Sequence, residues 1–318
     1  MSAFDLPQLF PFALAAAILF GLAFGSFLNV CIYRLPLGRS VVTPRSACPR
    51  CGHAIAAYDN VPVVSWLVLR GRCRACREPI AARYMFIELL IAALFAFCFL
   101  RFGYSLATLK FCVFVFLVLA LIFTDLDHRL LPDSLTLSGL GIATGFSVFV
   151  PMPSLGFGWE PSAFFLRMPF DLAWRVQSLL ESLAGAALGA LLIYGAGWLY
   201  LKLRGVEGMG FGDVKLMAMV GGFLGMQLAV CTIGGAAVAA SAFGLGAMLV
   251  VWMKRAQRHI AATHQPLAPA LGRAWRSARL IYRHYEIPFG SFLGFMALVA
   301  LFYGQALLGW YLRLWGLQ

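Results

Sequence analysis

The sequence predicts an all-α protein that crosses a membrane about eight times, and three observations lead to this prediction. Of its 318 residues, 62% are hydrophobic and only 12% are charged, and the mean hydropathy is +0.85, far above that of soluble domains. The apolar residues gather in windows of about the length that a helix needs to span a bilayer core of about 30 Å. Basic residues collect in alternate connections between these windows, as in the inner loops of membrane proteins.

Eight apolar windows are long enough to be the predicted spans. The first lacks the basic start and the small-residue cleavage site of a signal peptide, so we expect it to be retained as a span. Glycine and alanine fill the sixth and seventh windows and blur the boundary between them, and such small residues favour close helix packing in lipid. The windows are residues 10–32, 84–101, 105–124, 134–151, 178–201, 214–230, 231–253 and 288–312.

The distribution of Lys and Arg predicts the orientation of these spans. With eight spans and the N-terminus on the periplasmic side, 20 of the 25 basic residues fall on the inner side. This bias accounts for the net charge of +12 through topology alone. We therefore expect no nucleic-acid partner.

Polar segments divide the chain into its predicted parts. These are a first transmembrane helix in residues 1–32, a cytoplasmic segment in 33–83 and a membrane core in 84–318. The core contains a periplasmic loop at 151–177, rich in Pro and aromatic residues that suit the headgroup level. It also contains a basic cytoplasmic loop at 254–287, which we interpret as solvated or as an amphipathic stretch on the inner leaflet. We find no internal repeat.

Four cysteines of the cytoplasmic segment form two C-x-x-C pairs. Thiolates three residues apart on a tight turn can reach one ion, and two such turns complete a tetrahedral site. We therefore predict one structural zinc ion; two disulfides are the alternative, which a reducing cytoplasm disfavours. His53 is a further candidate ligand, although a surface histidine is the simpler interpretation. The predicted ligands are Cys48, Cys51, Cys73 and Cys76, whereas Cys31, Cys98, Cys112 and Cys231 lie in apolar windows and are expected to pack as small hydrophobes.

Two aspartates lie at the edges of predicted spans. Asp125 follows about fifteen nearly uninterrupted apolar residues. Asp213 ends the glycine-rich stretch GMGFGD, directly before another apolar run. The predicted topology places both at the same cytoplasmic depth. Glycines permit close approach of a bound chain and positive φ, so this turn could hold an extended peptide.

Two carboxylates at one depth suggest an aspartyl dyad. Held about 3 Å apart, they would share one proton, so that one takes a proton from an attacking water and the other donates one. The neighbouring acids have simpler interpretations, Asp133 as a helix N-cap and Asp127 as a solvated carboxylate. Lys215 points to another side of its helix, so we do not expect it to pair with Asp213. The glycine spacing fits neither a phosphate loop nor a dinucleotide fingerprint.

The motifs, taken in order, resemble those of the prepilin peptidases, or type IV leader peptidases, of the GxGD class of membrane aspartyl proteases. The resemblance covers most of the chain and implies that Asp125 and Asp213 are the catalytic pair. It implies a bacterial inner-membrane enzyme. The motifs are GSFLNVCIYRLP at 25–36, the four-cysteine segment at 48–84, DLDHRLLPD at 125–133, GMGFGDVKL at 208–216 and IPFGSFLG at 287–294.

The resemblance also implies a second activity. Members cleave the short basic leader of prepilins or secretion pseudopilins after a glycine, and many then methylate the new N-terminal residue, usually Phe, with S-adenosylmethionine. The four-cysteine segment accompanies methylation in full-length members. No sequence feature places the S-adenosylmethionine site. Gly71, Asn29 and Arg34 are candidates, with a turn glycine and a snorkelling helix-end arginine as the simpler interpretations. Acidic residues available to a basic leader are Glu78, Glu88 and Glu207.

Other functions stay open at this point. A peptidase without methyl transfer is one, and a zinc-organised scaffold without chemistry is another. An ion-coupled transporter would place acids near the midplane in two related halves, which this sequence does not suggest. The chain departs from the family pattern in a longer stretch between the two aspartates, with the excess near 151–175.

Overall fold

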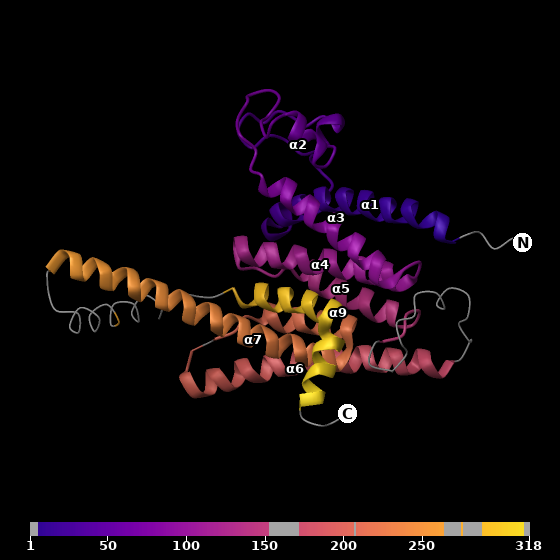
Figure 1. Ribbon diagram of the computed structural model, residues 1–318, viewed down its shortest axis with the longest axis vertical. Coiled ribbons are helices and arrows are strands. Elements are labelled where there is room, and N and C mark those ends of the chain that lie inside the picture. Colours follow the sequence, from indigo (N-terminus) through magenta and orange to yellow (C-terminus); the bar gives the residue numbers. More distant parts are fainter. Residues whose placement is uncertain (1–5, 153–171, 207, 264–274, 276–287, 315–318) are drawn as a thin grey trace, which may run out of the picture.

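The structure is a computed structural model that describes residues 6–152, 172–206, 208–263, 275 and 288–314. Its long elements are helices that lie roughly side by side (Figure 1). Small 3₁₀ turns at Leu35–Leu37 and Ala57–Asn60 and the short helix α2 (Val64–Val68) lie in the segment between the first two long helices. The long helices are α1 (Leu6–Arg34), α3 (Arg83–Phe102), α4 (Leu106–His128), α5 (Asp133–Ser147), α6 (Leu172–Arg204), α7 (Phe211–Thr263) and α9 (Phe289–Leu314).

This architecture confirms the predicted multi-pass helical membrane fold. In the described part of the chain, six helices are long and apolar enough to cross a membrane, namely all the long helices except α5. The 15-residue α5 coincides with the predicted fourth span. The 53-residue α7 covers both the sixth and the seventh predicted spans.

The helix α7 makes two crossings because the chain reverses at Gly225. This residue has φ 82° and ψ 176°, a conformation outside the helical region that only glycine adopts readily. In a straight helix, residues 213 and 243 would lie about 45 Å apart. Instead, Asp213 lies beside Gly290 and the ring of Phe243 packs on Phe292, so both contact the first turn of α9. The boundary predicted near residues 230 and 231 is therefore at Gly225.

Side chains of α6 satisfy the helix ends exposed by this reversal. The Glu181 carboxylate accepts a hydrogen bond from the Met226 backbone N–H at 3.1 Å, and the Ser182 hydroxyl donates to the Gly222 carbonyl at 2.8 Å. Backbone groups left without partners in a membrane would cost several kcal/mol each. These two contacts therefore allow a chain reversal within an apolar bundle.

Gly221 permits the closest contact between α6 and α7. A Cβ on Gly221 would lie only 2.0 Å from the carbonyl oxygen of Gly185. We expect Gly221→Ala to force the helices apart and to lower stability by about 1–3 kcal/mol or more. Gly141→Ala is the control, because nothing lies within 4 Å of that position and alanine favours helix by about 1 kcal/mol. Thermal unfolding in detergent measures both; equal melting temperatures would contradict this packing.

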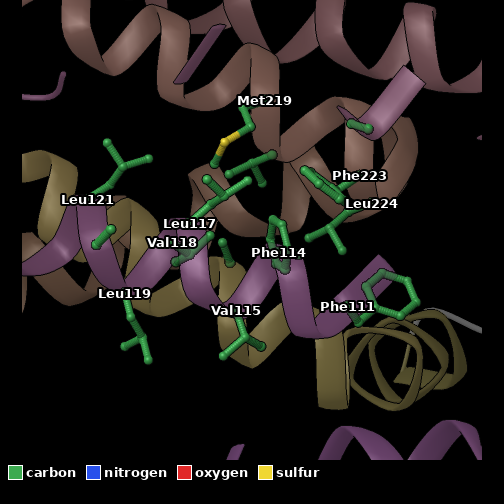
Figure 2. Close-up of a cluster of buried hydrophobic side chains, with 14 of the residues drawn as sticks. Phe111, Phe114, Val115, Leu117, Val118, Leu119, Leu121, Met219, Phe223 and Leu224 are labelled. Carbon is green, nitrogen blue, oxygen red and sulfur yellow. The ribbon is translucent and has the colours of Figure 1, made fainter. Parts of the chain in front are cut away.

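The most buried long helix is α4, which lies at the centre of the bundle. Its side chains at Phe111, Phe114, Val118 and Leu121 are at most 1% exposed. Figure 2 shows its large side chains meeting those of α7, including Phe223. Tight packing on all sides leaves this helix little freedom. Its last turn, which carries Asp125, is therefore held in a fixed place.

Two predicted loops fall largely outside the described residues. Of the periplasmic loop at 151–177, the structure describes only residues 151, 152 and 172–177, so the excess near 151–175 lies almost entirely outside the description. Of the basic loop at 254–287, residues 254–263 continue α7 as helix. Figure 1 shows this end of α7 extending beyond the ends of the neighbouring helices.

Candidate active site and metal centre

The structure brings Asp125 and Asp213 together. Asp125 lies in the last turn of α4 and Asp213 in the first turn of α7, and their exposures are 6% and 8%. A Cβ placed on Gly290 would lie 3.0 Å from Asp213 Oδ1 and 3.1 Å from Asp125 Oδ2. The two oxygens are therefore no more than about 6 Å apart, the sum of these distances. Gly290 leaves the space between them free of a side chain.

A third residue, Ser291, binds Asp125 directly. Asp125 Oδ2 accepts hydrogen bonds from the Ser291 backbone N–H at 2.6 Å and from its hydroxyl at 2.7 Å. The sequence analysis did not identify Ser291 as part of the site. Its only signal in the sequence is its place in the motif IPFGSFLG.

Two of the glycines before Asp213, Gly208 and Gly212, are needed for close approach and not for unusual backbone angles. None of Gly208, Gly210 and Gly212 has a positive φ. A Cβ on Gly208 would lie 2.3 Å from the ring of Tyr200, and one on Gly212 would lie 3.1 Å from Leu131. The suggestion that these glycines serve a positive-φ turn is therefore wrong for this structure.

The four predicted metal ligands also converge. The sulfur atoms of the four C-x-x-C cysteines all lie within 4.8 Å of one another, and those of Cys48 and Cys76 are 3.8 Å apart. Four thiolates around zinc, each at about 2.3 Å, would be about 3.8 Å apart in a regular tetrahedron. Backbone N–H groups of Cys51 and Arg50 lower the pKa of the Cys48 thiol to about 6. The cluster could hold a metal ion, and all four cysteines are free of disulfides.

Comparisons with known proteins show which family the chain belongs to. The Bacterial Peptidase A24 N-terminal domain matches residues 19–102, and the Type IV leader peptidase family matches residues 112–245, which include both aspartates. A relative named prepilin leader peptidase/N-methyltransferase from Aeromonas hydrophila is 32% identical over 318 residues, 92% of each chain. This chain belongs to the type IV leader peptidase family. A relative of the same name from Stutzerimonas stutzeri is 32% identical over 325 residues, 95% of this chain and 94% of that one.

A third relative of that name, from Myxococcus xanthus, is 41% identical to this leader peptidase over 209 residues, which are 64% of this chain and 54% of the relative. No solved structure matches the chain.

Two other acids near the dyad of this leader peptidase, Asp133 and Asp127, form ion pairs. Both carboxylate oxygens of Asp133 lie 2.7 Å from Lys215 Nζ, and no side chain caps the start of α5, so the N-cap interpretation of Asp133 is wrong. Asp127 pairs with Arg83 at 2.7 Å and is not merely solvated. As predicted, Lys215 does not pair with Asp213. These bridges join α5 to α7 and α3 to α4 around the dyad.

The two C-x-x-C turns of the leader peptidase are built alike. In each turn, the backbone N–H of the first cysteine donates a hydrogen bond to the carbonyl oxygen of the residue five positions later. The carbonyl oxygen of the same cysteine accepts a hydrogen bond from the N–H of the residue four positions later. His53 contributes a backbone carbonyl to the first turn and is not in the metal-ligand cluster, so the structure does not support it as a ligand. The contacts are Cys48 with His53 and Gly52, and Cys73 with Glu78 and Arg77.

The three candidate residues for the methyl donor have structural contacts of their own. Gly71 has φ 64°, and a Cβ there would lie 2.7 Å from the Trp66 ring. The Asn29 amide donates to the Tyr84 carbonyl at 3.1 Å, and Arg34 donates to the Ser40 carbonyl at 3.0 Å. Because these contacts do not bring the three candidates to one place, we assign no residue to the methyl donor.

The acidic residues considered for a basic leader also have internal partners. Glu88 accepts a hydrogen bond from the Val63 backbone N–H at 2.7 Å and thereby joins the segment at 33–83 to α3. Glu78 forms an ion pair with Arg50 at 3.2 Å. Glu207 lies outside the described residues.

Proposed function

We propose that this leader peptidase cleaves the basic leader from prepilins or secretion pseudopilins at Asp125 and Asp213, and that it methylates the new N-terminal residue. The meeting of these two carboxylates in front of Gly290 carries the proposal. The transporter hypothesis needed acids near the midplane. These acids instead lie at the ends of α4 and α7, which argues against that hypothesis.

The two carboxyl groups would share one proton. The ionised group takes a proton from water as the water oxygen bonds to the peptide carbonyl carbon. The protonated group donates to the carbonyl oxygen as that oxygen becomes negative. Collapse of this intermediate breaks the C–N bond: the leaving nitrogen takes a proton from one carboxyl group, and a hydroxyl of the intermediate returns its proton to the other. The products are the leader carboxylate and the free amine of the mature protein.

We propose that Cys48, Cys51, Cys73 and Cys76 hold one zinc ion. Four thiolates fill a tetrahedral zinc ion and leave no open position for a catalytic water, so the ion would order the cytoplasmic segment. The second activity uses S-adenosylmethionine, which supplies an electrophilic methyl group when bound. The amine released by cleavage is the nucleophile that accepts this group.

The proposed setting is a bacterial inner membrane with the N-terminus in the periplasm and the dyad facing the cytoplasm. The basic bias of the inner connections supports this orientation. We propose the same division of the chain as above: a first helix in 1–32, the zinc-binding segment in 33–83 and the peptidase core in 84–318. The lipid bilayer and the prepilin substrates are then its partners.

The purified protein tests this function directly. It is incubated in detergent with S-adenosylmethionine and either a type IV prepilin peptide or a pseudopilin peptide, and the products are read by mass spectrometry. We expect a shortened peptide that carries one added methyl group on its new N-terminal residue. Intact peptides after prolonged incubation with both substrates would contradict the proposal, and cleavage without methylation would restrict it to the peptidase.

A further inference from the structure

The two carboxyl groups of the dyad have different surroundings. Asp125 Oδ2 accepts two hydrogen bonds from Ser291, one from the backbone N–H and one from the hydroxyl. A backbone N–H can only donate, so Oδ2 keeps a lone pair toward it and cannot carry a proton in that direction. Ser291 lies in the first turn of α9, where N–H groups lack helical acceptors and the helix end is partly positive. These contacts favour a carboxylate at Asp125.

Asp213 has no such donors among the residues that the structure describes. Two basic groups on the elements around the dyad are paired with acids other than Asp213. Arg83 of α3 binds Asp127 of α4, and Lys215 of α7 binds Asp133 of α5. Within the described part of the chain, the charge that faces Asp213 is therefore that of Asp125.

We propose that Ser291 is a positioning residue that holds Asp125 in its ionised form, so that the shared proton resides on Asp213. Asp125 is then the base that activates water through its free oxygen, and Asp213 is the acid. This division of roles rests on the proposed peptidase function. It concerns which carboxyl performs which step, whereas the function requires only that both take part.

The chain offers a matched control for this contact. A second Gly-Ser-Phe-Leu sequence, Gly25–Leu28, lies on α1, and its Ser26 lies beside the Glu88 carboxyl group of α3. Both serines follow a glycine that packs against a neighbouring element, and each contacts a carboxyl group. Ser26 lies in the contact between α1 and α3, away from the dyad, whereas Ser291 binds Asp125 of the dyad. Removing the Ser26 hydroxyl should leave the cleavage rate unchanged.

The test compares leader cleavage by the wild type, Ser291→Ala, Ser291→Thr and Ser26→Ala, with kcat and KM measured across pH. We expect Ser291→Ala to lower kcat about 10- to 100-fold, the worth of one hydrogen bond to a charged group, with KM unchanged within about twofold. The pH profile of its activity should also differ from that of the wild type, because one of the two donors to the Asp125 carboxyl group is lost. Ser291→Thr keeps the hydroxyl and should restore most of kcat.

Each outcome decides the proposal. A wild-type kcat in Ser291→Ala would overturn the Ser291 proposal and leave the peptidase function intact. Equal losses of kcat in Ser291→Ala and Ser291→Thr would also overturn it. An equal loss in Ser26→Ala would overturn it too, because the effect would then not be specific to the dyad. Melting temperatures in detergent accompany the rates. A Ser291→Ala protein that melts with the wild type but cleaves slowly with a shifted profile supports the assignment.

Discussion

Asp125→Asn and Asp213→Asn are each expected to lower kcat for leader cleavage by about 10²- to 10⁴-fold, the usual contribution of general acid and base catalysis. Asparagine has nearly the shape of aspartate and keeps one acceptor oxygen, so the contact with Ser291 can persist. It can neither accept a proton from water nor donate one as a carboxylic acid does. The measurement is the rate of prepilin peptide cleavage by each purified variant in detergent.

The neighbouring acids provide controls for charge and position. Asp127 and Asp133 lie near the dyad and bind Arg83 and Lys215 in partly exposed ion pairs. Such pairs contribute about 0–1 kcal/mol to stability, so Asp127→Asn and Asp133→Asn should cleave within a few fold of the wild type. If all four asparagine variants lost activity equally, the loss would follow from removing any of these four carboxylates and would not single out Asp125 and Asp213 as a dyad.

The second large effect is expected from loss of the metal. Cys48→Ser removes one of four ligands, and structural zinc binding contributes about 10–16 kcal/mol to folding of small zinc modules. We expect the zinc content to fall from about one ion per chain to near zero and methylation to be lost. Cleavage should persist, because the dyad is built from α4 and α7 and not from the cysteine segment.

Cys231→Ser is the matched control for this variant. Cys231 is a half-buried, free cysteine in α7, outside the metal-ligand cluster. Its zinc content, read by elemental analysis of the purified protein, should equal that of the wild type. A metal-free wild-type protein that both cleaves and methylates would contradict the zinc proposal.

Features with a local signature could be predicted from the sequence. Apolar windows indicate spans because a bilayer sets their length, and the C-x-x-C pairs place two thiols on one turn whatever surrounds them. The meeting of Asp125 and Asp213 followed from topology, since an even number of crossings between them returns the chain to the same side. These predictions needed no knowledge of which helices are neighbours.

Features that depend on neighbouring helices could not be predicted in this way. Ser291 acquires its role only because the first turn of α9 packs against the last turn of α4. The sequence around Asp133 indicates a helix N-cap, but α5 begins at Asp133 itself, and Lys215, 82 residues further along the chain, binds its carboxylate. Gly225 is one of many glycines in α7, and the partner Glu181 that permits reversal there lies on α6. Each depends on a long-range contact.

The most direct test of the central claim is a cross-linking experiment on Asp125→Cys/Asp213→Cys with a short thiol-reactive cross-linker, read by mass spectrometry of the linked peptides. The carboxylate oxygens lie within about 6 Å of each other, so we expect residues 125 and 213 to be linked in high yield. The native pair Cys48 and Cys76, whose sulfurs are 3.8 Å apart, serves as the positive control in zinc-depleted protein. A link between Cys48 and Cys76 without one between positions 125 and 213 would contradict the account.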